Sequence, residues 1–111
     1  MGEIFVERTF SCEGQPLVCR WFKPERRDFV ASNGNSGEEY HCRCSILWPD
    51  HEQTQTIVGI DGVQALTLAM GYVHHALLLR RERDVLDIRW LDGRQLGLPP
   101  TDEDWTASSR D

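Results

Sequence analysis

Apolar and polar residues alternate over several stretches in the first half of the chain. The clearest is 39–48, where one face of an extended strand would carry Tyr40, Cys42, Cys44 and Ile46, and the other His41, Arg43, Ser45 and Leu47. Strands are also predicted over 3–12, 17–23 and 53–60, which are rich in β-branched and aromatic residues. The turn at 13–16 predicts that the first two strands form a hairpin with a four-residue loop.

The segment 24–38 lacks such alternation. Its second half, 31–37, consists of Ala, Ser, Asn and Gly, a composition typical of a mobile loop. We therefore expect a long irregular connection, and connections of this length are either functional or loosely ordered.

A single helix is predicted over 61–83. Asp61 is a good N-cap, and Gln64 three residues later completes a capping box. Arg80, Arg81 and Arg83 lie near the end of the helix, where its dipole favours cations.

This helix is more apolar than one contact with a sheet requires. One stripe, expected to cover the sheet, comprises Leu66, Ala69, Met70, Val73, Ala76 and Leu77. A second stripe comprises Leu68, Tyr72, His75 and Leu79. Large exposed apolar patches are rare on monomers, so we expect the second stripe to be covered. The cover is either the C-terminal segment, through Trp90, Leu96 and Leu98, or a homodimer seam or partner protein.

After the helix, 85–91 predicts a short fifth strand, and Asp92-Gly93 a type I′ turn. The predicted order is thus β-β-β-β-α-β. Consecutive strands with short turns favour an antiparallel meander. The predicted fold class is α+β, with an antiparallel sheet of four to five strands and one long helix packed across one face.

Length and charge place further limits on the chain. Its 111 residues suit one domain over 1–100, followed by an acidic, disordered tail over 101–111. That tail carries −3 of the net charge of −6, from four acidic residues and one Arg. Nucleic acid is not expected as a partner, because phosphate binding needs clustered basic residues. The N-terminus lacks a secretory signal, and no run approaches the roughly 18 apolar residues of a membrane span, so we expect a cytoplasmic protein without a membrane partner.

The cysteines offer a weak case for chemistry. Cys12 and Cys19 are separated by six residues and Cys42 and Cys44 by one, neither of which is the usual spacing of a zinc knuckle. Cys12 and Cys19 flank the first turn and would be neighbours in some hairpin registers, but a reducing cytoplasm disfavours a disulfide. His41 would point to the opposite face from Cys42 and so could not activate it. We therefore expect no enzyme activity, no metal and no cofactor.

The face of the sheet turned away from the helix is the main candidate surface. If Cys42 and Cys44 point towards the helix, alternation places five candidate binding residues on the outer face: Phe5, Glu7, Arg20, Phe22 and Arg43. Arg and aromatic residues are enriched in protein interfaces. The same alternation turns Arg8 inward, which suggests that the first strand is bulged or lies at an edge. The helix stripe Leu68, Tyr72, His75 and Leu79 is the second candidate surface.

The stretch Gly59-Ile60-Asp61-Gly62-Val63-Gln64-Ala65-Leu66-Thr67-Leu68-Ala69-Met70, followed by Trp90-Leu91-x-Gly93 and Leu96-Gly97-Leu98-Pro99, resembles a small family of uncharacterised bacterial domains. The likeness covers about 56–99. It implies no activity, cofactor or catalytic residue. Small orphan domains of this kind resemble immunity proteins, which neutralise a toxin by binding it.

The leading hypothesis is therefore a small non-catalytic protein-binding module, of the kind represented by a bacterial immunity or inhibitor protein that neutralises a toxin or effector. One alternative is a homodimeric structural or regulatory domain that pairs through its apolar helix. Another is a metal protein or enzyme that depends on its cysteines.

Overall fold

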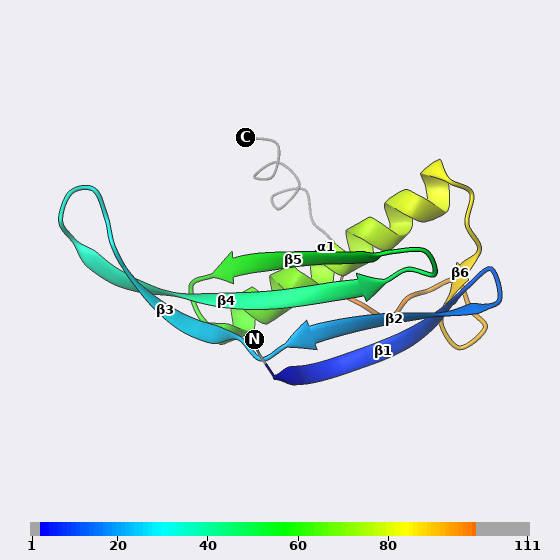
Figure 1. Cartoon of the computed structure of the whole chain (residues 1–111), viewed down its shortest axis with the longest axis horizontal. Helices are drawn as coiled ribbons and strands as arrows, with labels where there is room; N and C mark the ends of the chain where they lie inside the picture. Colours follow the sequence, from blue (N-terminus) through cyan, green and yellow to red (C-terminus); the bar gives the residue numbers. More distant parts are fainter. Residues whose placement is uncertain (1–2, 100–111) are drawn as a thin grey trace.

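The computed structural model describes residues 3–99, which form two layers. One long helix lies across one face of an antiparallel sheet (Figure 1). The elements in chain order are β1 (Ile4–Cys12), β2 (Gln15–Phe22), β3 (Glu25–Val30), β4 (Ser36–Leu47), β5 (Glu52–Gly59), α1 (Gly62–Arg83) and β6 (Ile88–Arg89). The predicted α+β class is confirmed, with the order β-β-β-β-β-α-β.

The 12-residue β4 organises the sheet. Its first half, 36–41, pairs with β3, and its second half, 44–47, pairs with β2 on the same edge. Its other edge pairs with β5 over 40–47. Beyond β2 follow β1 and the short β6. As a result β3 and the start of β4 extend past the body as a two-stranded arm, at the left of Figure 1. We call residues 25–39 the arm.

The arm corrects the expectation of an irregular loop over 24–38. Six of these residues form β3 and three more belong to the start of β4. The pattern was missed because every residue of β3 is exposed, so no apolar alternation marks the strand. One cross-strand ion pair, between Arg26 and Glu38, links it to β4 instead, and the side-chain atoms of this pair lie 2.7 Å apart.

Three local predictions also need correction. The first hairpin turns through two residues, Glu13 and Gly14, both with positive φ, so its loop is shorter than expected. The strand predicted over 85–91 shrinks to the two residues of β6, which pair with the end of β1. The second tight turn is centred on Leu91 and Asp92, both with positive φ, and lies one residue before the predicted Asp92-Gly93 position.

The helix follows its prediction closely. Asp61 caps it, with a side-chain oxygen that accepts from the Gln64 amide at 2.8 Å, and the Gln64 side chain accepts from the Ile60 amide. An 18-residue window of α1 has a mean hydropathy of 1.2, so by length and composition the helix is apolar enough to cross a membrane. No such segment was expected from the sequence, because no unbroken apolar run is long enough. Such a window is also typical of a core helix. Here the first predicted stripe largely faces the sheet: its members Ala69, Val73, Ala76 and Leu77 are buried, and so is Ala65 one turn before Ala69.

The C-terminal segment folds back over the body, as one of the two alternatives predicted. Leu96 is buried, Trp90 and Leu98 pack against the core, and the Pro99 carbonyl lies 3.1 Å from the His74 ring nitrogen. On a helix, His74 lies on the flank opposite to Leu68 and Tyr72. This contact therefore lies on a different flank from the one that sequence reasoning assigned to the segment. The tail predicted over 101–111 lies outside the described residues.

Arg8 explains how an inward-facing charge fits this fold. Its guanidinium donates hydrogen bonds of 2.9 Å to the carbonyls of Leu96 and Gly97 and lies 3.8 Å from the centre of the Trp90 ring. The inward direction inferred from alternation was therefore correct. The returning C-terminal segment, which we call the strap (residues 94–99), supplies its partners.

Candidate functional site

The outer face of the sheet carries no other layer within residues 3–99 (Figure 1). Alternation predicted its members well, because the register places Glu7 opposite Arg20 and Arg20 opposite Ser45. The Arg20 and Glu7 side chains form an ion pair of 3.0 Å. The residues on the other face, Cys19, Trp21, Cys42, Cys44 and Ile46, are all buried against the helix layer.

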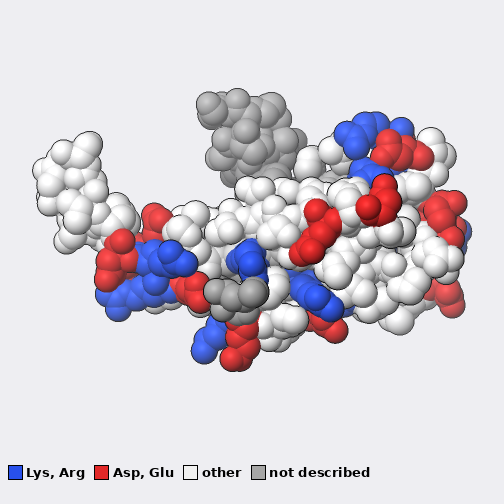
Figure 2. All heavy atoms as spheres, viewed as in Figure 1, with Lys and Arg blue, Asp and Glu red and all other residues white. Residues whose placement is uncertain are grey.

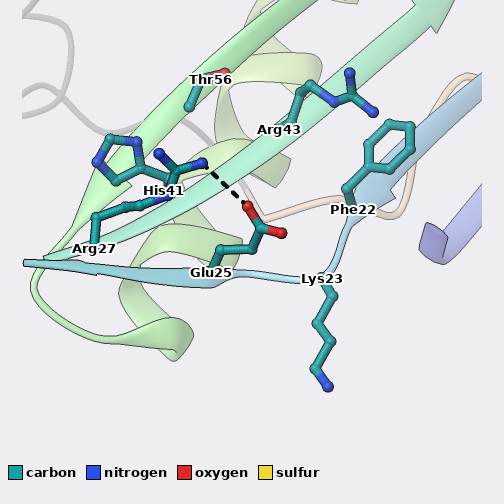
Figure 3. A pocket seen from close by; sticks show the side chains of 7 residues that line it. All are labelled: Phe22, Lys23, Glu25, Arg27, His41, Arg43 and Thr56. Atoms are coloured by element: carbon teal, nitrogen blue, oxygen red, sulfur yellow. Dashed lines mark hydrogen bonds and ion pairs between the residues drawn. The ribbon is translucent and has the colours of Figure 1, made fainter. Parts of the chain in front are cut away.

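Where the arm leaves the body, the outer face forms a hollow of about 230 Å³. It lies at the junction of β2, β3, β4 and β5, and Figure 3 shows its lining. The residues around it are Phe22, Lys23, Glu25, Arg27, His41, Arg43 and Thr56. Two of the predicted binding residues, Phe22 and Arg43, are thus brought together here.

Arg43 and Phe22 contact each other in the lining of the hollow. The guanidinium carbon of Arg43 lies 4.0 Å from the centre of the Phe22 ring, a distance typical of a cation–π contact. Phe22 follows Trp21, which β2 pairs with Cys44, so the two strands themselves bring the ring beside Arg43. Within the described part of the chain, Arg43 has no carboxylate partner. Its hydrogen-bonding edge is therefore available to an acceptor from outside.

The other charges around the hollow are largely balanced. Arg27 lies 3.3 Å from Glu25, an ion pair drawn in Figure 3, and His41 lies 2.6 Å from Glu39. The side chain of Lys23 points away from the remaining lining residues (Figure 3). Among the cations that point into this hollow, Arg43 is consequently the one that has no carboxylate partner within residues 3–99. A single carboxylate or an aromatic ring is a better fit than a highly charged ligand.

Phe5 is not part of this surface, which corrects its predicted position. The pairing of β1 with β2 has a bulge between Ile4 and Val6. A bulge places an extra residue in one strand and so shifts the alternation. Phe5 lines a separate apolar pocket beside the start of the helix, together with Tyr40 and Leu66.

The second predicted surface, the helix stripe, lies beside β5. The Tyr72 hydroxyl accepts a hydrogen bond of 2.8 Å from the Gln53 side chain. Leu68, Tyr72 and His75 are half-buried, and Leu79 remains 45% exposed. The contact of the strap with His74 lies on another flank, and the cover predicted for this stripe stays a prediction.

The four cysteines are buried free thiols. Cys12 pairs with Gln15 and Cys19 with Arg8 in the sheet register, so the two are not opposite each other. Burial raises the pKa of Cys19 and of Cys44 to about 12 and that of Cys42 to about 11, which disfavours the reactive thiolate. His41 lies on the opposite face from Cys42, as predicted, and points to Glu39. Among residues 3–99, no group of three or more His, Cys, Asp or Glu side chains is arranged to hold a metal ion.

Sequence reasoning missed several residues of the hollow. Glu25 and Arg27 were assigned to a loop, so their position beside β4 was not foreseen. His41 and Thr56 belong to strands that were predicted. Alternation already placed His41 on the same face as Arg43, and this was the signal that could have identified it.

The fold and the hollow define a class of small α+β domain with one helix-covered face and one open face. The chain belongs to a specific family: the model for a domain of unknown function, DUF6968, matches residues 6–100. Searches among curated proteins and among solved structures gave no match. The expected resemblance to an uncharacterised family is thus confirmed over a longer range than 56–99, and the family itself assigns no activity.

Proposed function

We propose that this protein is a non-catalytic binding module whose partner is another protein, contacted through the open face of the sheet. The observation that carries the proposal is the Arg43–Phe22 pair in its hollow. Arg and aromatic residues are the types most often found at the energetic centres of interfaces. Here the ring already holds the guanidinium in place, so little side-chain freedom would be lost on binding.

The charges of the hollow support a partner that presents a carboxylate. Arg43 can donate two parallel hydrogen bonds to one Asp or Glu side chain, while Glu25 and Glu39 nearby disfavour a ligand with several negative charges. Arg20, paired with Glu7 further along the face, would lie at the rim of such an interface. A more specific form of the proposal is an inhibitor that neutralises a bacterial toxin or effector by direct binding.

The test is partner capture with a photo-crosslinking amino acid at Thr56, which lines the hollow. We expect a covalent adduct with one protein in the producing cells. Replacing Arg43→Glu should abolish the adduct and weaken binding of the purified partner by about 30-fold or more, which corresponds to about 2 kcal/mol for an interface centre.

Arg83→Glu is the matched control, because it makes the same change of charge at a 62% exposed side chain on the helix layer. It should leave the adduct intact. Equal capture by both variants would remove the hollow from the interface. A small molecule that binds the wild-type hollow, with no protein partner captured, would contradict the proposal as a whole.

A further inference from the structure

The arm is a two-stranded structure with no covering layer among the described residues. All six residues of β3 are exposed, and β3 pairs only with β4, so its outer edge leaves backbone hydrogen-bonding groups free. A two-stranded hairpin is marginally stable by itself in water. Unprotected edges also favour pairing with another strand. The arm is therefore the part of this fold that gains most from an added strand.

The tip of the arm differs from its stem. Residues 29–37 contain no charged side chain, and they form the white lobe at the left of Figure 2. Phe29 packs over Gly37, where an added Cβ would lie 2.9 Å from the ring. Phe29 nevertheless stays 42% exposed and Val30 74% exposed. The arm thus ends in an uncovered apolar group.

The base of the arm carries a matching apolar hollow on the helix side of the sheet. Its volume is about 440 Å³, and its lining includes Phe5, Pro24, Tyr40, Val63 and Leu66. The neighbouring side chain of Val6, which lies opposite Trp21 on the helix side, is exposed as well. Each molecule therefore has an apolar tip and, about 20 Å away along a six-residue strand, an apolar receptacle.

Antiparallel pairing of two β3 strands about a twofold axis would join these features. Residues that face each other across an antiparallel pair point to the same side of the sheet. In a pair of identical strands, this requires the twofold axis to pass through one residue position and not between two neighbouring residues. With Arg27 at the axis, Val30 lies opposite the partner's Pro24 and Arg26 opposite the partner's Asp28. Within one copy, Val30 pairs with Ser36 of β4, and Ser36 shares the helix-side face with Tyr40. The Val30 side chain therefore lies on the same face as the receptacle.

The position of Val30 favours this register over its neighbour. The Arg26–Asp28 contact occurs twice, and the two opposed Arg27 side chains are each already paired with their own Glu25 at 3.3 Å. A shift that moves the axis to Asp28 would oppose two carboxylates, each 3.3 Å from its own Arg26, and would place Val30 against the partner's Arg26. Like charges are opposed at the axis in both registers, so the apolar contact of Val30 with the partner's Pro24 decides between them.

We infer that this protein forms a homodimer through its arms, in which β3 of each copy pairs with β3 of the other and each Val30 tip fills the apolar hollow at the base of the partner's arm. The interface is the same patch on both subunits, so it closes on itself and does not propagate. This inference is independent of the proposed function, because it uses the arm edge and the helix-side hollow and not the Arg43–Phe22 pair.

The test measures the mass of the purified protein alone by sedimentation or light scattering, from micromolar to submillimolar concentration. We expect reversible dimerisation. Val30→Glu should raise the dissociation constant roughly tenfold or more, because it places a charge in the apolar hollow. Val85→Glu is the control: Val85 is 84% exposed and lies beyond the far end of the helix, so this variant should still dimerise. Circular dichroism checks that both variants keep their fold.

Charge exchange and labelling identify the register. Arg26→Asp should weaken the dimer, and Arg26→Asp combined with Asp28→Arg should restore it. Because the native thiols are buried, a spin label can be attached selectively to Ser32→Cys at the tip of the arm. In a mixture with an unlabelled copy, this label should broaden the amide signals of Phe5 and Val63 of that copy. A monomer at every concentration would overturn the inference. So would a dimer that dissociates on Leu79→Glu and not on Val30→Glu, since that result assigns the seam to the helix stripe.

Discussion

Arg8 should contribute more to stability than any ion pair on the surface of this domain. Its guanidinium reaches from β1 to the strap and makes three contacts: hydrogen bonds of 2.9 Å to the carbonyls of Leu96 and Gly97, and a stack at 3.8 Å on Trp90. We predict that Arg8→Ala loosens the strap and lowers the free energy of unfolding.

The size of the effect follows from these contacts. A hydrogen bond from a charged donor is worth about 1.5 kcal/mol at the lower end of its range, which suits the part-buried bond to Leu96. The exposed bond to Gly97 adds about 0.5 kcal/mol, and the cation–π contact about 1 kcal/mol. The sum of about 3 kcal/mol is a large part of the 5–15 kcal/mol by which a domain is typically stable.

Urea unfolding followed by circular dichroism measures the loss. Arg20→Ala is the matched control, since it removes an Arg of the neighbouring strand that has only a surface ion pair with Glu7, and it should cost about 0.5 kcal/mol. Arg8→Lys should be intermediate, because Lys keeps the charge but cannot reach both carbonyls and lie flat on the ring. Equal losses for Arg8→Ala and Arg20→Ala would refute the reasoning, as would full stability in Arg8→Lys.

Two further predictions concern close packing and pH. Gly59→Ala should lower the free energy of unfolding by about 1–3 kcal/mol, because the added Cβ would lie 2.5 Å from the Ala65 backbone nitrogen; Gly62→Ala, with nothing nearer than 3.8 Å, is the control in the same urea assay and should be neutral or stabilising. The pKa values of Cys19, Cys42 and Cys44 are raised from the ordinary thiol value of 9.0. Their contribution to the free energy of unfolding should therefore be constant below pH 9. It should fall between pH 9 and 12, because the unfolded chain loses these protons first. Each thiol contributes a slope of up to about 1.4 kcal/mol per pH unit in that window, so Cys44→Ala should show a shallower fall; an unchanged slope would contradict the assignment.

The helix and the inner face of the sheet could be predicted because their signals are local and repeat. Asp61 and Gln64 mark the start of α1 by side-chain chemistry that needs no tertiary context. Cys42 and Cys44 share a face by strand geometry alone. The inward position of Arg8 also followed from alternation, but the strap that supplies its polar partners was not predicted from it.

The features that could not be predicted depend on contacts between distant residues, or on backbone conformations that the residue type does not favour. The arm has no buried side, so its charged stem resembles a loop until Arg26 is seen beside Glu38. Val85 and Leu91 adopt positive φ, which is unfavourable for a β-branched or bulky side chain and carries no signal in the sequence. The bulge that moves Phe5 is likewise set by pairing with β2.

The exposed apolar residues are unevenly distributed over the molecule, and this bears on both proposals. At the end where the helix finishes, polar contacts close the structure: the Arg81 side chain donates to the carbonyls of Ile88 and Arg94, and the Glu13 amide donates to the Asp87 carbonyl. Leu79, Val85 and Leu91 are nevertheless exposed there. Most of the uncovered apolar side chains gather at the arm end, and they include Ile4, Phe5, Val6, Phe29, Val30, Ile60 and Val63. The hollow with Arg43 also lies at this end, on the other side of the same sheet. Glu25 and Arg27 line this hollow and also belong to β3, the proposed dimer edge, so a partner on the open face and a second copy would adjoin at this end of the sheet.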